Sequence, residues 1–179
     1  MAGNSNQEQI NQLASSVQLL VLDVDGVMTD GSLYFSSNGD ETKAFNTMDG
    51  LGLKLLQSSG VKVAIITGRQ SDIVAQRAAS LGIDIIYQGS DDKLNVLDEI
   101  LSDLGLNYSD VAYAGDDLPD LACIKNSQFG ISVPNAHTLV KEAADAVTSR
   151  EGGRGAVREI CDWILSAQGN YDEAVSPYQ

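Results

Sequence analysis

The stretch LLVLDVDGVMTDG, residues 19–31, decides how the chain folds. It begins with an apolar run that predicts a strand buried on both faces, and the run ends by placing two carboxylates at Asp23 and Asp25. Burying a charge is costly unless the charge is paired or bound to a metal. The two acids therefore either cap a loop, or hold a cation and take part in chemistry. Gly26 removes side-chain bulk where the chain leaves the strand and turns.

A buried strand followed by an amphipathic helix is a pattern that recurs along the chain. It predicts strands at residues 17–24, 61–67, 83–88, 110–116, 127–133 and 145–149. It predicts helices at residues 48–60, 70–82, 90–105, 136–143 and 155–168, a short helix from Leu118, and Ser90 as the N-cap of the helix at 90–105. Strand–helix alternation at this spacing predicts an α/β fold with a parallel sheet.

The segments around these elements indicate one domain that carries a hairpin insertion after the first strand. Residues 38–40 (Asn-Gly-Asp) lie between short alternating segments, which predicts a β-hairpin at about residues 31–45. No repeat or low-complexity linker divides the chain, so we expect residues 17–168 to form one domain. We expect residues 1–16 to be a flexible or helical lead-in and residues 169–179 to be a loosely held tail.

The composition limits the possible partners. Of the 179 residues, 25 are Asp or Glu and 11 are Lys or Arg, so the formal net charge is −14, which argues against nucleic acid or an anionic membrane. A small anionic substrate is still compatible, because a few cations can gather in one pocket. The polar N-terminus shows no signal peptide and no apolar run reaches the roughly 20 residues of a membrane span, so we expect a cytoplasmic protein. Cys123 and Cys161 lack CxxC spacing and are expected to be reduced core thiols.

Polar residues that phosphoryl chemistry can use follow several of the predicted strands. Asp23 and Asp25 follow the first strand, residues 67–69 (Thr-Gly-Arg) the second, and residues 116–117 (Asp-Asp) the fourth, while Lys93 begins the helix after the third. In a parallel α/β sheet the ligand crevice lies at the carboxyl ends of the strands. Each acid alone is often just a helix cap, but structural needs seldom place all of these groups at one edge.

The charge of the substrate class suggests a metal site. A phosphate monoester is a dianion that repels a carboxylate nucleophile, and a divalent cation held by carboxylates removes this repulsion. Mg²⁺ suits such all-oxygen ligands. We expect Asp116 to complete the Mg²⁺ site, with Asp117 and Asp120 as hydrogen-bonding neighbours of the ligands. Lys93 adds a positive charge that restrains the clustered acids.

The two acids after the first strand are expected to take different roles. Asp23 attacks phosphorus and forms an aspartyl-phosphate. Asp25, two residues further on, protonates the leaving alkoxide and then activates the water that cleaves the intermediate. Thr67 offers hydroxyl and backbone donors to the phosphoryl oxygens.

These residues lie in four short motifs, DVDG, ITGR, SDDK and GDDLPD, which cover about residues 19–120. Their identity and order resemble those of the phosphatases of the haloacid dehalogenase superfamily. The resemblance implies a Rossmann-like three-layer sandwich, bound Mg²⁺ and the roles given above. It also implies that Asp23 and Asp116 bind the metal through their side chains and Asp25 through its backbone carbonyl.

A closer resemblance covers nearly the whole chain after residue 17. The absence of a large cap domain, with KAFNTMDGLGLKLL, AIITGR and GGRGAVREICD, is similar to the phosphatases of 3-deoxy-D-manno-octulosonate 8-phosphate (KDO 8-phosphate). That family makes KDO for lipopolysaccharide in Gram-negative bacteria, and it implies a homotetramer in which the hairpin and tail of a neighbouring subunit help to close the site. Tyr34 and Phe35, large side chains on the hairpin, are candidate subunit contacts.

The same resemblance assigns the substrate contacts. Besides Asp25 and Lys93 they are Asn46, Thr47, Met48, Asp49, Gly50, Lys54, Gly68, Arg69, Arg77 and, from a neighbouring subunit, Arg154. Judged from the residues alone, Lys54, Arg77 and Arg154 could equally be solvated surface cations. Met48 departs from the family, because some relatives carry Arg there. Another 2-keto sugar-acid phosphate, such as a nonulosonate 9-phosphate, is therefore the alternative substrate.

Two non-enzymatic alternatives differ in class. A receiver domain places similar acids, Thr and Lys on a similar sheet, but its phospho-acceptor Asp ends a later strand, whereas here Asp-x-Asp follows the first strand. A catalytically inactive binding subunit has no need of an intact set of Asp23, Asp25, Lys93 and Asp116. Both alternatives therefore fit the residues less well than a phosphatase does.

Overall fold

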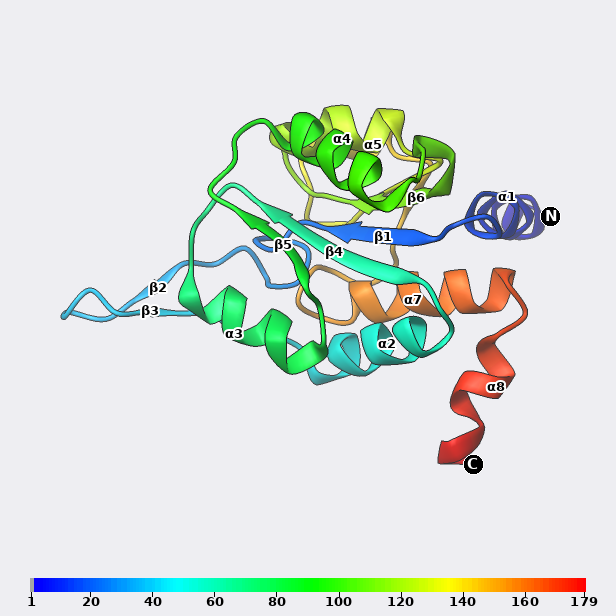
Figure 1. Cartoon of the computed structure of the whole chain (residues 1–179), viewed down its shortest axis with the longest axis horizontal. Helices are drawn as coiled ribbons and strands as arrows, with labels where there is room; N and C mark the ends of the chain where they lie inside the picture. Colours follow the sequence, from blue (N-terminus) through cyan, green and yellow to red (C-terminus); the bar gives the residue numbers. More distant parts are fainter. Residues whose placement is uncertain (1) are drawn as a thin grey trace.

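The computed structural model describes residues 2–179, with side chains from residue 7 onward, and its centre is a six-stranded sheet (Figure 1). The strand order is β5-β4-β1-β6-β7-β8, and every neighbouring pair is parallel. The strands are β1 (Leu19–Leu22), β4 (Lys62–Thr67), β5 (Ile85–Gln88), β6 (Val111–Ala114), β7 (Phe129–Ser132) and β8 (Ala146–Val147). The predicted α/β fold with a parallel sheet is confirmed.

Helices cover both faces of the sheet (Figure 1). Alternate side chains of β1 enter different cores: Leu20 and Leu22 pack with α2, α3 and α7, whereas Leu19 and Val21 pack with α4, α5 and α6. The helices on the first face are α2 (Thr47–Ser58), α3 (Asp72–Leu81) and α7 (Ala156–Ala167). Those on the second face are α4 (Lys93–Leu104), α5 (Leu121–Asn126) and α6 (Thr138–Ala143). The result is the expected three-layer sandwich.

The start of α4 corrects one prediction. The helix begins at Lys93, and its N-cap is Asp92, whose carboxylate accepts a hydrogen bond of 3.2 Å from the Asn95 amide. Ser90, the predicted cap, lies before the helix, and its hydroxyl donates instead to the Asp92 carbonyl at 3.4 Å. Asp92 and not Ser90 caps the helix, because Asp92 directly precedes the first turn, whose backbone amides have no helical partner.

A hairpin extends away from the sheet after β1 (Figure 1). Its strands, β2 (Tyr34–Phe35) and β3 (Glu41–Thr42), are antiparallel, and Gly39 lies in the turn with a φ of 88°. Tyr34 is 49% exposed and Phe35 is 59% exposed, so both apolar side chains of β2 are open to solvent in the single chain. The hairpin insertion was predicted, and its position agrees with the sequence pattern.

The terminal segments pack on the same face as α7. Helix α1 (Ala2–Ala14) buries Ile10 and Ala14 in the core, and the last segment forms α8 (Tyr171–Val175) and a short 3-10 helix, η3 (Ser176–Tyr178). Two more 3-10 turns, η1 (Tyr108–Asp110) and η2 (Leu118–Asp120), precede β6 and α5. Both cysteines are buried free thiols. Among residues 2–179, no helix combines the length and the apolar character needed to cross a membrane.

Candidate active site

The carboxyl ends of β1, β4 and β6 open onto a cavity of about 360 Å³. The loops after these strands and the start of α4 supply its walls, because parallel strands bring their carboxyl ends to one edge of the sheet. Of the predicted site residues, those that line this cavity are Asp23, Asp25, Thr67, Gly68, Arg69, Lys93, Asp116, Asp117 and Asp120.

Four of the charged residues that line this cavity lie together, and we call Asp23, Lys93, Asp116 and Asp120 the acid cluster. Lys93 Nζ lies 2.8 Å from Asp23 Oδ1 and 2.7 Å from Asp120 Oδ1. Asp23, Lys93 and Asp120 are all buried, and Asp120 is only 1% exposed. Burial works against the Lys93 charge, but the carboxylates of Asp23 and Asp120 outweigh it and raise the pKa of Lys93.

Asp120 is fully occupied by hydrogen bonds. Its Oδ1 also accepts from the Tyr113 hydroxyl at 2.8 Å, and its Oδ2 accepts from the backbone amides of Asp116 at 3.1 Å and Asp117 at 3.2 Å. Asp117 Oδ1 in turn accepts from the Leu118 amide at 2.8 Å and so caps η2. Asp120 therefore fixes the loop that carries Asp116. This arrangement fits the role predicted for Asp120 from the sequence, a hydrogen-bonding neighbour of the metal ligands.

Asp116 is the acid in this cluster with an unused oxygen. Its Oδ1 is buried and has no hydrogen-bond partner among the described residues. Burial, and then the charge of Asp23, raises the pKa of Asp116 to about 8. Burial, and then the charge of Asp120, raises the pKa of Asp23 to about 6. The cluster holds three carboxylates and one lysine, which pairs only with Asp23 and Asp120, so it carries surplus negative charge.

This donor set fits a hard divalent cation. Single oxygens of Asp23, Asp116 and Asp120 lie within 4.8 Å of one another, and carboxylate oxygens are the ligands that Mg²⁺ prefers. Because Asp120 is already saturated by Lys93, Tyr113 and two amides, Asp23 and Asp116 are the side chains with free capacity.

Gly26 allows the loop after β1 to pass close to Asp116. A Cβ at this position would lie 2.0 Å from Asp116 Oδ2, and the backbone has a φ of 100°, which side chains other than glycine rarely adopt. The loop is supported from the other side by Asn135, whose side-chain amide donates to the Gly26 carbonyl at 2.9 Å. Asn135 Oδ1 accepts from the Gly152 amide at 2.9 Å. Sequence reasoning missed Asn135, because nothing near it in the chain indicates this contact.

Asp25 belongs to a second group of charges, and we call Asp25, Glu41, Lys43 and Arg69 the hairpin-base cluster. Lys43 forms an ion pair with Asp25 Oδ1, and Arg69 Nε lies 3.7 Å from Asp25 Oδ2. Glu41 Oε1 accepts from Arg69 at 2.8 Å, and Glu41 Oε2 accepts from the Ser71 hydroxyl at 3.1 Å. Glu41 and Lys43 were not predicted from the sequence, since their partners depend on where the hairpin returns to the sheet.

The remaining predicted substrate residues lie outside this cavity in the single chain. Asn46 caps α2 by accepting from the Met48 amide at 2.8 Å, and Thr47 is exposed beside it. Arg77 donates to the Asn46 carbonyl at 3.4 Å, and a Cβ at Gly50 would be 2.4 Å from Arg77 Nη2. Asn46, Gly50 and Arg77 are therefore neighbours at the start of α2.

Asp49 and Met48 lie on the side of α2 that faces α7, away from Arg77. Asp49 is 3% exposed, and its Oδ1 accepts from the Arg158 backbone amide at 2.8 Å, in the first turn of α7. A carboxylate is stabilised there by the free amides of the helix N-terminus. Met48 is 45% exposed and lines a separate polar cavity with Arg150 and Trp163.

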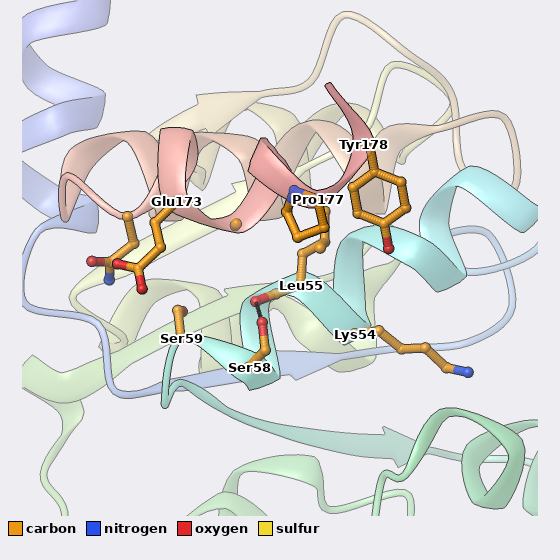
Figure 2. Close-up of a pocket in the computed structure, with 9 residues that line it drawn as sticks. Lys54, Leu55, Ser58, Ser59, Glu173, Pro177 and Tyr178 are labelled. Carbon is orange, nitrogen blue, oxygen red and sulfur yellow. Dashed lines mark hydrogen bonds between the residues drawn. The ribbon is translucent and has the colours of Figure 1, made fainter.

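Lys54 and Arg154 are likewise apart from the acid cluster. Lys54 is exposed and lines a larger cavity of about 610 Å³ between α2 and the C-terminal segment, as Figure 2 shows. Arg154 is exposed on the loop before α7, where the Ser32 amide and, to a smaller extent, the Arg154 charge lower the pKa of Asp30. The fold thus gathers the predicted residues of the strand ends and of the start of α4 in one cavity, but it leaves the other predicted substrate contacts dispersed.

Comparisons with known proteins agree with this geometry. A profile of the haloacid dehalogenase-like hydrolases matches residues 80–160. The 3-deoxy-D-manno-octulosonate 8-phosphate phosphatase KdsC of Escherichia coli strain K12 is 47% identical over 161 residues, which are 90% of this chain and 86% of that protein.

Two solved structures are similar over most of their length. The 3-deoxy-D-manno-octulosonate 8-phosphate phosphatase of Moraxella catarrhalis, in complex with a magnesium ion, a phosphate ion and KDO, has a TM-score of 0.95 and 48% identity, and the match covers 96% of this chain and 99% of that one. The cobalt-bound phosphatase YrbI of Haemophilus influenzae has a TM-score of 0.86 and 38% identity, with 89% and 94% covered.

Proposed function

The chain belongs to the family of 3-deoxy-D-manno-octulosonate 8-phosphate phosphatases, and we propose that it hydrolyses KDO 8-phosphate to KDO and inorganic phosphate. The observation that carries this proposal is the acid cluster at the carboxyl end of β1, in which three carboxylates lie together and a single lysine pairs with two of them. Such a surplus of negative charge is of no use to a dianionic substrate unless a cation is bound.

The side chains of Asp23 and Asp116, with the backbone carbonyl of Asp25, are proposed to hold Mg²⁺. The unused, buried Oδ1 of Asp116 supports this choice of ligands. A bound Mg²⁺ supplies positive charge that offsets the repulsion between carboxylates and phosphate and stabilises charge during transfer. Lys93 keeps Asp23 and Asp120 in place through its two ion pairs.

The first chemical step forms an aspartyl-phosphate on Asp23. An Asp23 carboxylate oxygen attacks phosphorus, the bond from phosphorus to the sugar oxygen breaks, and Asp25 gives its proton to that oxygen. Thr67, at the end of β4 and 2% exposed, lines the cavity where its hydroxyl can donate to a phosphoryl oxygen. Lys93, at the start of α4, lies 2.8 Å from Asp23 and adds a positive charge beside the phosphoryl group.

The second step releases phosphate. Water attacks phosphorus, its proton goes to the carboxylate of Asp25, and the bond between phosphorus and Asp23 breaks. Asp25 is then protonated again and Asp23 is free, so the chain returns to its starting state. The two half-reactions therefore need Asp25 to give and then take one proton.

We also propose a homotetramer in which each site is completed by a neighbour. The exposed Tyr34 and Phe35 and the dispersed positions of Lys54, Arg77 and Arg154 support this, because a single chain does not bring these cations to the acid cluster. Mixing two inactive variants, Asp23→Asn and Arg154→Ala, tests the proposal. Mixed oligomers should recover activity if Arg154 serves the neighbouring site, and no recovery after dissociation and reassembly would contradict it.

The remaining parts of the proposal concern organisation and location. Residues 17–168 would form the hydrolase domain, residues 1–16 a lead-in and residues 169–179 a tail. The enzyme would act in the cytoplasm, and its product would enter lipopolysaccharide synthesis. The substrate contacts of the 46–50 segment, Gly68 and Arg69 are proposed from the family resemblance.

A phosphate-release assay tests the function directly. With Mg²⁺ present, KDO 8-phosphate should be hydrolysed with a higher kcat/KM than nonulosonate 9-phosphates or hexose phosphates. EDTA should stop turnover, and added Mg²⁺ should restore it. A higher kcat/KM for a nonulosonate 9-phosphate would move the substrate assignment to the alternative that Met48 suggests, and turnover that EDTA does not affect would remove the metal from the mechanism.

A further inference from the structure

Lys43 is a buried ammonium group that does not touch the catalytic cavity. Its side chain is 1% exposed, and it follows β3 at the base of the hairpin. Among the described residues its carboxylate partners are Asp25, through Oδ1, and Glu41, whose Oε1 lies 3.7 Å from Nζ. Lys43 is not part of the cavity wall to which Asp25 and Arg69 belong. Lys43 therefore does not contact a substrate bound in this cavity directly, and its link to the cavity is the ion pair with Asp25.

The two oxygens of Asp25 have different surroundings. Oδ1 is held by Lys43 on the buried side, and Oδ2 lies 3.7 Å from Nε of Arg69, which lines the cavity and has a side chain 44% exposed. A carboxylate that is tied by one oxygen keeps the other free to exchange a proton. The structure thus gives the two oxygens of Asp25 separate tasks.

Glu41 keeps both cations in place. Its Oε1 accepts from Arg69 Nη2 at 2.8 Å and its Oε2 accepts from the Ser71 hydroxyl at 3.1 Å, so β3 is joined to the loop between β4 and α3. Lys43 is fixed between Glu41 and Asp25 by this arrangement. An ammonium that is buried and held on two sides has little rotational freedom, which makes it a suitable anchor for a carboxylate.

We propose that Lys43 is a positioning residue for proton transfer, which it controls by holding Asp25 through Oδ1. Oδ2 then gives its proton to the leaving sugar oxygen as the ester bond to phosphorus breaks and the bond from Asp23 to phosphorus forms. Oδ2 later takes a proton from the water that attacks the aspartyl-phosphate, as the bond between Asp23 and phosphorus breaks. The inference rests on the proposed function, because it assigns an anchor to that same reaction.

A purely structural role is the alternative, in which the pair only ties the hairpin to the sheet. Such a role predicts a lower stability of Lys43 variants and an equal loss for all substrates. A positioning role predicts a loss that depends on the leaving group. An alkoxide needs a proton to leave, whereas p-nitrophenolate is a good leaving group without one.

A double-mutant cycle separates the two readings. Phosphorylation of the enzyme is measured in single turnovers for the wild type, Lys43→Met, Asp25→Asn and the double variant, with KDO 8-phosphate and with p-nitrophenyl phosphate. Lys43→Met should slow the reaction of KDO 8-phosphate about tenfold or more, with little change in KM, and should leave the p-nitrophenolate burst almost unchanged. In the Asp25→Asn background, Lys43→Met should have no further effect.

Controls keep the result interpretable. Lys62→Met, at the exposed amino end of β4 and away from the carboxyl ends that carry the site, should match the wild type. Lys43→Arg should recover part of the lost rate. If Lys43→Met does not fold, Lys43→Ala, which also leaves Oδ1 without its cation, takes its place in the cycle and is compared with Lys43→Arg.

Two results would overturn the proposal. One is additive losses from Lys43→Met and Asp25→Asn, which would mean that Lys43 acts independently of Asp25. The other is an equal loss with both substrates. A wild type that does not hydrolyse KDO 8-phosphate contradicts the proposed function instead, and the cycle is then run on an alkyl phosphate that the enzyme does hydrolyse.

Discussion

The acid cluster and the hairpin-base cluster lie beside each other but differ in charge balance. Three carboxylates and one lysine make up the acid cluster, while the hairpin-base cluster, once Asp25 has given up its proton, has two carboxylates and two cations. The acid cluster is also deeper, since Asp23 and Asp120 have side chains 9% and 1% exposed, against 20% for Asp25.

The pKa values follow this difference. In the acid cluster, burial and neighbouring carboxylates raise the pKa of Asp23 and Asp116. At the hairpin base, burial also opposes the charge of Glu41, but hydrogen bonds from Arg69 and Ser71 outweigh it and lower the pKa of Glu41. A cluster with surplus negative charge needs a further cation, whereas a balanced cluster needs none. The first arrangement therefore suits metal binding, and the second suits holding a proton-transfer group in one orientation.

Replacing the nucleophile should have the largest effect. Asp23→Asn removes the oxygen that attacks phosphorus, so kcat should fall by at least ~10⁴-fold. It also removes one negative charge from a crowded, buried cluster, so the thermal midpoint in EDTA should be equal to that of the wild type or higher. Phosphate release and calorimetry measure the two quantities. Wild-type turnover, or a midpoint that falls sharply, would contradict the roles given to the acid cluster.

Replacing the acid of the hairpin-base cluster should have the next largest effect. Asp25→Asn keeps the shape of the side chain but cannot give or take a proton, so kcat for KDO 8-phosphate should fall by about 10²–10⁴-fold. The loss should be smaller in the burst with p-nitrophenyl phosphate. Equal losses with both leaving groups would show that Asp25 contributes something other than proton transfer.

The acid cluster should make stability depend on pH when no metal is bound. The pKa values of Asp23 and Asp116 are about 6 and about 8 in the fold, above their usual value of 3.8. Between pH 3.8 and about 6 for Asp23, and between pH 3.8 and about 8 for Asp116, the folded chain therefore holds a proton that the unfolded chain has lost. Stability in EDTA should therefore fall as the pH rises through about 6 and then about 8. Glu41 does not add to this fall, because its pKa is lowered from the usual value and not raised.

Magnesium should change that dependence. A bound cation replaces the protons, so added Mg²⁺ should raise the thermal midpoint most at the alkaline end of the interval. Asp116→Asn should flatten the pH dependence in EDTA. Thermal melts across this range, with and without Mg²⁺, measure both effects, and a midpoint in EDTA that rises with pH would contradict the surplus charge of the acid cluster.

The smallest expected effect comes from the tyrosine behind the acid cluster. Tyr113→Phe removes the hydrogen bond to Asp120 Oδ1 in a fully buried setting, and should cost about 1–2 kcal/mol of the free energy of unfolding. Tyr108→Phe removes a similar hydrogen bond, to Asp98, at a partly exposed site and is the matched control. Its cost should be smaller, and equal costs would mean that burial does not strengthen the pair in the acid cluster.

Prediction from the sequence worked best where position along a strand decides position in space. Asp23, Thr67 and Asp116 each follow an apolar run, and neighbouring parallel strands bring their ends to one edge, so their meeting could be predicted without coordinates. Lys93 follows the same logic at the start of α4. The cap of α4 was assigned wrongly to Ser90, because two acids and a serine in a row all suit a cap and only the backbone selects Asp92.

The sequence alone determined the order of strands and helices, the hairpin insertion and the set of residues at the strand ends, because hydrophobic periodicity and turn residues are local properties of the chain. Only the tertiary structure decided which side chains complete that set. Lys43 and Asn135 reach the loop after β1 from distant segments, and Asp49 turns to α7 and away from the cavity. Such contacts depend on how loops return to the sheet, and no spacing in the chain records that path.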